Sequence, residues 1–151
     1  MKFFNSLFQR GDDADQTDGD TKPDAQQMAI AVLLVEGAKA DQVFAPGERA
    51  IIEHFLAETF ELDPAGAATL CSEAEIVQAE AVDLHRFTKQ VKELPAEEKI
   101  GFIEALWRIV LSDGEKDAYE DALIRRICGL IYVTDRESGD ARKAAQAGLN
   151  A

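Results

Sequence analysis

Two turns rich in carboxylates carry the residues of this chain that are best suited to chemistry. The second turn has four of them within eight residues: Asp113, Glu115, Asp117 and Glu120. The first turn keeps two, at the equivalent positions: Asp41 and Glu48. Closely spaced carboxylate oxygens are the ligands that hard divalent cations prefer. The sequence therefore predicts a divalent-metal site in the second turn, with a weaker pair of ligands in the first.

The same carboxylates have a purely structural interpretation. Asp117 and Glu120 have the spacing of a capping box, and Asp41 and Asp113 can accept hydrogen bonds from amides of their own turns. An EF-hand is excluded, because it would need glycine and glutamate where Ala118 and Ile124 stand. Metal binding and helix capping both remain open at this point.

Catalysis has no positive support elsewhere in the sequence. Neither His54 nor His85 has a second histidine at helical spacing, and Cys71 and Cys128 fall within predicted helices, where cysteine behaves as a small apolar residue. A glycine-rich phosphate loop, a Gly-x-Ser-x-Gly elbow and a His-Glu-x-x-His motif are absent. We expect no enzyme, no catalytic residue and no cofactor other than a divalent metal ion. A hydrolase that uses paired carboxylates such as Asp113 and Glu115 is the enzymatic alternative.

Composition and charge restrict the kinds of partner and the location that we expect for the protein. The chain has 151 residues, 46% of them hydrophobic, which suits one globular domain. Sixteen Lys and Arg against 29 Asp and Glu give a net charge of −13, so a nucleic-acid partner is not expected. Cysteine usage fits a reducing compartment, and no apolar run is long enough to span a bilayer. We expect a cytoplasmic protein, or one held peripherally at the inner membrane surface.

The first 24 residues are predicted to lie outside the domain. Residues 1–10 form a short amphipathic helix, because four apolar side chains recur at i,i+4 spacing: Phe3, Phe4, Leu7 and Phe8. This face either contacts a membrane surface or a partner, or folds back onto the domain. Residues 11–24 carry six aspartates and no large apolar side chain, which predicts a disordered acidic linker.

Residues 25–148 are predicted to form one all-α domain of about seven helices. The expected helices cover residues 24–40, 46–60, 64–82, 83–92, 95–110, 117–130 and 134–147. The first is apolar nearly all round, which is typical of a central, buried helix. Trp107 belongs to the apolar stripe of the fifth. In the sixth, Tyr119, Leu123, Ile127 and Leu130 are expected to point inward.

An internal repeat relates the two acidic turns. Asp41 superposes on Asp113 and Glu48 on Glu120 with one offset, since 113 − 41 and 120 − 48 are both 72. The flanking apolar positions agree, with Leu34 falling on Leu106. A helix, an acidic turn and a helix therefore occur twice, with the third and fourth helices between the copies. This pattern predicts a bundle with pseudo-two-fold symmetry.

Three segments of the chain together resemble a known family. They are VLLVEGAKADQVFAPGERAIIEHFL, AEAVDLHRFTKQV and IEALWRIVLSDGEKDAYEDALIRRI. In this order they resemble the bacterial TerB-like family, named for tellurite-resistance protein TerB and shared with the N-terminal domain of the co-chaperone DjlA. The resemblance covers about residues 25–145. The first turn departs from the family at Gln42, where a glycine commonly follows the aspartate, as Gly114 does in the second.

The resemblance implies an all-helical domain whose acidic turns have been proposed as metal-binding, in proteins linked to membrane-associated stress response and tellurite resistance. We therefore expect a binding or sensing module with a protein partner and with peripheral membrane contact through Phe3, Phe4, Leu7 and Phe8. The alternative is a structural protein–protein interaction domain without a metal site. No segment resembles a J-domain, so chaperone recruitment is not implied.

Overall fold

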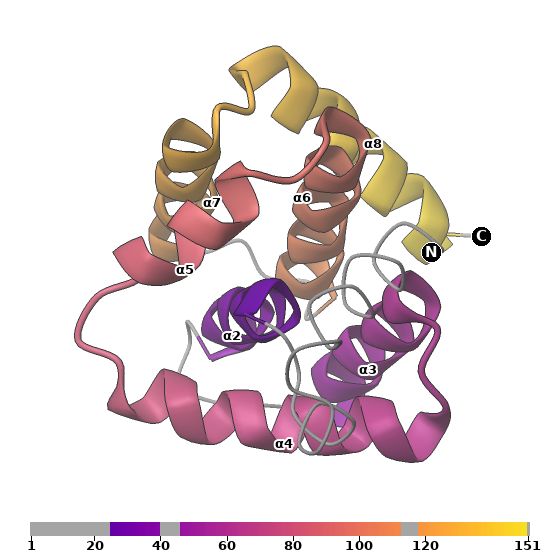
Figure 1. Cartoon of the computed structure of the whole chain (residues 1–151). Coiled ribbons are helices and arrows are strands. Elements are labelled where there is room, and N and C mark those ends of the chain that lie inside the picture. The colour runs from indigo at the N-terminus through magenta and orange to yellow at the C-terminus, as the bar shows by residue number, and fades with distance from the viewer. Residues whose placement is uncertain (1–24, 40–45, 113–117, 151) are drawn as a thin grey trace.

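The computed structural model describes residues 25–39, 46–112 and 118–150. The predicted N-terminal helix (1–10) and acidic linker (11–24) lie outside these residues. Within them the fold is all-α, as predicted, with seven helices and no strand (Figure 1). The helices are α2 (Ala25–Ala38), α3 (Pro46–Phe60), α4 (Pro64–Glu80), α5 (His85–Lys92), α6 (Ala96–Leu111), α7 (Ala118–Ile131) and α8 (Asp135–Asn150). None of these helices has the length and apolar character needed to cross a membrane.

Helix α2 occupies the centre of the bundle. Ten of its 14 residues are buried, which confirms the prediction from its all-round apolar character. Helices α3, α4, α5 and α6 all pack against it (Figure 1). A helix surrounded in this way needs no polar face, because little of its surface reaches water.

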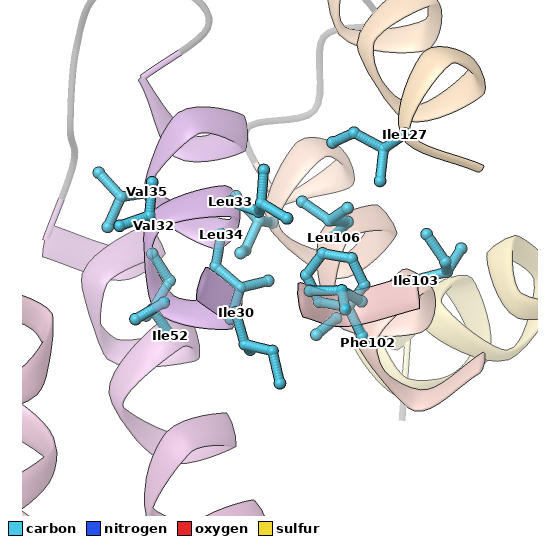
Figure 2. Packing of buried hydrophobic residues seen from close by; sticks show 14 of the residues in the cluster. Ile30, Val32, Leu33, Leu34, Val35, Ile52, Phe102, Ile103, Leu106 and Ile127 are labelled. Atoms are coloured by element: carbon cyan, nitrogen blue, oxygen red, sulfur yellow. The ribbon is translucent and has the colours of Figure 1, made fainter. Parts of the chain in front are cut away.

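The core forms where α2 crosses α6. Ile30, Leu33 and Leu34 of α2 face Phe102 and Leu106 of α6 (Figure 2), and all five side chains are at most 1% exposed. Gly37 permits the close approach of the two helices, since a Cβ there would lie 2.9 Å from Leu106 Cδ2. Burial of these large aliphatic and aromatic groups is the main source of stability for a domain of this kind.

Two helix starts form as the sequence predicts. Asp63 caps α4, because its Oδ1 accepts a hydrogen bond of 2.7 Å from the Gly66 amide, and Pro64 follows at the first helical position. At α8, the Glu137 amide donates to Thr134 Oγ1 at 3.0 Å, and the Thr134 amide donates to Glu137 Oε1 at 2.9 Å. These reciprocal bonds are the predicted capping box.

The repeated unit is larger than the sequence offset indicates. Helices α3 and α7 end alike, with a residue of positive φ (Glu61, 56°; Tyr132, 66°). In both, the next amide donates to a carbonyl five residues back, Leu62 to Ala57 and Val133 to Cys128.

The helices that follow these two ends also correspond. Helix α4 packs on α2 as α8 packs on α6, so each copy has three helices and only α5 lies between them. The prediction that both α4 and α5 separate the copies was therefore wrong for α4, which belongs to the first copy. The equivalent ends of α3 and α7, at Glu61 and Tyr132, are 71 residues apart rather than 72. A single offset of 72 therefore does not align the third helix of each copy.

The inward face of α7 differs from the prediction at Leu130. Its side chain is 37% exposed, whereas Ile131 is fully buried. Buried positions of α7 run through Leu123, Ile124, Ile127 and Cys128, so the stripe continues by a four-residue step to Ile131. Leu130 therefore falls on the edge of the stripe, and the Tyr119 side chain lies outside the described residues.

Trp107 is a core residue, as predicted, and its polar atom has an internal partner. The indole is 7% exposed, and its Nε1 donates a hydrogen bond of 3.0 Å to Ser138 Oγ of α8. The Arg142 guanidinium lies 5.1 Å from the centre of the Trp107 ring. These contacts attach α8 to α6 through one aromatic side chain.

We predict that Ser138→Ala destabilises the domain by about 1–3 kcal/mol, because the buried indole N–H loses its acceptor. Trp107→Phe removes the donor instead, so Ser138→Ala should cost less in that background. Urea unfolding, monitored by circular dichroism, measures the free energy of unfolding of the wild type, the two single variants and the double variant. Equal effects of Ser138→Ala in both backgrounds would show that this hydrogen bond does not stabilise the fold.

Candidate functional site

Glu48 and Glu120 are the two predicted site residues that the structure describes. Each is the third residue of its helix, α3 or α7, and the two are only 3% and 1% exposed. Their remaining predicted partners, Asp41, Asp113, Glu115 and Asp117, lie outside the described residues. The repeat thus places one buried carboxylate at the end of each acidic turn, where the next helix begins.

Burial of these glutamates constrains what surrounds them. A carboxylate removed from water is costly unless hydrogen-bond donors or a cation compensate its charge. The first turn of a helix provides part of this compensation, because amide groups there point toward the side chain and the helix dipole favours negative charge. The helix start is therefore one source of compensation for the buried carboxylate in each repeat, and a cation would be a second.

The two repeats differ in charge at the residue that follows each glutamate. Arg49 follows Glu48, whereas Asp121 follows Glu120. Arg49 binds Glu53 at 2.7 Å and Glu75 at 2.9 Å, and it donates to Ser72 Oγ at 2.7 Å. A cation of the protein itself is thus built into the first repeat, where it joins α3 to α4. The second repeat has a carboxylate in its place, so the Arg49 link between two helices has no counterpart at this position. This difference is visible in the sequence, because Arg49 and Asp121 are equivalent at the offset of 72 residues.

Glu48 and Glu120, the two described site residues, belong to helices that do not pack on each other. Helices α3 and α7 lie on opposite sides of the α2–α6 pair (Figure 1). Across residues 25–39, 46–112 and 118–150, no group of three or more His, Cys, Asp or Glu side chains could hold a metal ion. Any complete ligand set would therefore need the carboxylates of a turn itself.

A polar cavity of about 480 Å³ lies between α6, α7 and α8. Asp121 and Asp135 line it together with Arg125 and Arg142, so its formal charges balance. The cavity occurs here because α8 packs mainly on α6 and makes few contacts with α7. The corresponding α3 and α4 pack closely, with Arg49 between them.

The histidines and cysteines are placed as the sequence indicates. His54 is exposed and lies 3.4 Å from Glu58 on its own helix, and His85 is exposed at the start of α5. Cys71 and Cys128 are buried free thiols. Burial raises the pKa of both thiols, that of Cys71 to about 11, although the nearby Arg49 guanidinium opposes the shift at Cys71. Neither thiol has the lowered pKa of a nucleophile.

The raised pKa of Cys71 predicts a loss of stability at alkaline pH. The folded protein binds the thiol proton more tightly than the unfolded chain, whose pKa is near 9.0. The stabilising contribution is therefore complete below pH 9 and falls as the pH rises toward 11. Cys71→Ala should unfold with a weaker dependence on pH in this range than the wild type, as measured by urea unfolding. Parallel profiles for the two proteins would contradict the assignment.

Comparison with known proteins identifies the family. A family model described as "Tellurite resistance protein TerB" matches residues 27–143. The chain belongs to the TerB family. The match begins in α2 and ends in α8, so this TerB domain includes all seven described helices and both acidic turns. Comparison with curated proteins and with solved structures gave no significant match.

Proposed function

We propose that this TerB domain is a binding or sensing module that takes up a divalent cation at its second acidic turn. The observation that carries the proposal is Glu120, a carboxylate that is 1% exposed directly after the turn that contains Asp113, Glu115 and Asp117. A cation bound there would offset the repulsion between these groups and share in compensating the buried charge.

The second turn is favoured over the first by its charge. Four carboxylates within eight residues, offset only by Lys116, form a negative segment. The first turn has two carboxylates, and Arg49 lies beside the buried Glu48. Because all these ligands are oxygen atoms, the module should prefer Ca²⁺, Mg²⁺ or Mn²⁺ over ions that prefer sulfur or nitrogen ligands.

Calorimetric titration of the full chain with Ca²⁺, Mg²⁺, Mn²⁺ and Zn²⁺ tests the proposal. Glu120→Gln should weaken binding more than its repeat counterpart Glu48→Gln, which serves as the matched control. Circular dichroism of both variants verifies that they fold. Absence of heat from every ion at millimolar concentration would leave the alternative, in which the carboxylates only cap helices and the domain binds a protein partner without metal.

A role in tellurite resistance rests on the family that the chain belongs to. We expect expression of the chain in a tellurite-sensitive bacterium to raise the tellurite concentration that stops growth. Asp113→Asn should lose this protection if ion binding is part of the function. If Asp113→Asn and the wild type protect equally at the same protein level, tellurite resistance does not depend on the cation site.

A further inference from the structure

An apolar groove of about 470 Å³ runs between α3 and α6. Ile51 and Phe55 form one wall, and Gly101 and Ala105 contribute to the other. Ile51 and Phe55 pack against the core but remain half-exposed. The groove therefore presents apolar surface that the described residues leave uncovered.

The charged residues at the rim do not close this groove. His54 pairs with Glu58 along α3 at 3.4 Å, and Arg108 pairs with Glu104 along α6 at 3.6 Å. Both contacts join residues four positions apart on one helix, so neither crosses from α3 to α6.

Gly101 leaves additional space in the α6 wall. A Cβ built at this position meets no heavy atom of the described residues within 4 Å. Glycine is unfavourable inside a helix, and here no close approach of another described element requires it. The α6 wall therefore has room for an occupant of the groove at this position.

The chain itself contains a segment with the matching chemistry. Phe3 and Leu7, and likewise Phe4 and Phe8, have the i,i+4 spacing with which an amphipathic helix enters an apolar groove. Lys2 and Arg10 give residues 1–10 a formal charge of +2, whereas residues 25–151 have 13 Lys and Arg against 23 Asp and Glu, a formal charge of −10. The segment and the domain therefore attract each other, whereas an anionic lipid surface would repel the domain.

The linker is long enough for this contact. Fourteen residues separate Arg10 from Ala25, the first residue of α2. They span about 50 Å when extended. A domain of this size has a radius of gyration of about 14 Å, so the whole surface is within reach. We propose that residues 3–8 occupy the α3–α6 groove of their own chain and cover its apolar surface.

A spin label on the full chain tests this proposal. Gln9→Cys introduces a thiol beside the segment, and the buried Cys71 and Cys128 should react slowly with the label. We expect the label to broaden the amide resonances of residues 50–58 and 101–108. Phe4→Ser combined with Phe8→Ser should abolish the broadening while leaving the groove intact.

Two glycine variants provide a matched comparison. Gly101→Leu fills the groove from the α6 wall and should also abolish the broadening. Gly129→Leu, on α7, is the control, because its Cβ likewise meets nothing within 4 Å, and it should leave the broadening unchanged.

Three results would overturn the proposal. One is the absence of broadening at the groove. Another is broadening only when spin-labelled chains are mixed with isotope-labelled ones, which would assign the segment to a second copy. The third is a spin label that becomes ordered only when anionic vesicles are added, which would assign the segment to a membrane surface.

Discussion

Phe102→Ala should lower the free energy of unfolding by about 3–5 kcal/mol, the largest effect that we expect from a single substitution in this protein. The Phe102 side chain is fully buried where α6 meets the central helix α2 (Figure 2). Truncation removes a large apolar group from the core and leaves a cavity that rigid neighbouring helices fill only in part.

Urea unfolding measures this effect, and Ile76→Ala is the control. Ile76 is 62% exposed on α4, so its truncation should change the stability by less than about 0.5 kcal/mol. Equal losses from the two substitutions would mean that the α2–α6 contact is not the centre of the core.

The second large effect depends on the proposed cation site. An ion that binds only the folded state at 100 times its dissociation constant should stabilise the protein by about 2.7 kcal/mol. Asp113→Asn should lose this increment while barely changing the stability without metal. Asp41→Asn, its counterpart in the first turn, should retain it. Thermal unfolding of the three proteins with and without the ion makes the comparison.

Asp117→Ala separates the capping role from the metal role. It should cost about 1 kcal/mol even without metal, because Asp117 is predicted to cap α7. It should also reduce the increment from the ion. If no divalent ion at millimolar concentration shifts the melting temperature of the wild type, the metal hypothesis is wrong and only this capping effect should remain.

Sequence by itself determined the features of this protein that arise from local chemistry. The Asp63–Pro64 and Thr134–Glu137 pairs predicted helix starts that the structure confirms, since a cap bonds amides only two or three residues away. The all-round apolar character of residues 28–35 predicted the central position of α2. The fold class followed from the same helical pattern, and the TerB family followed from the resemblance of three segments of the sequence.

Tertiary structure alone decided which surfaces are covered. Leu130 and Ile131 are adjacent apolar residues, and only the helices packed around α7 determine that Ile131 is buried and Leu130 exposed. The same holds for Glu48 and Glu120, whose depth no spacing rule predicts, and for the groove at Gly101, which depends on how far α3 lies from α6. Each of these features depends on segments that are distant in sequence. The burial of a side chain is determined by the residues that these segments place against it, and not by the residues next to it along the chain.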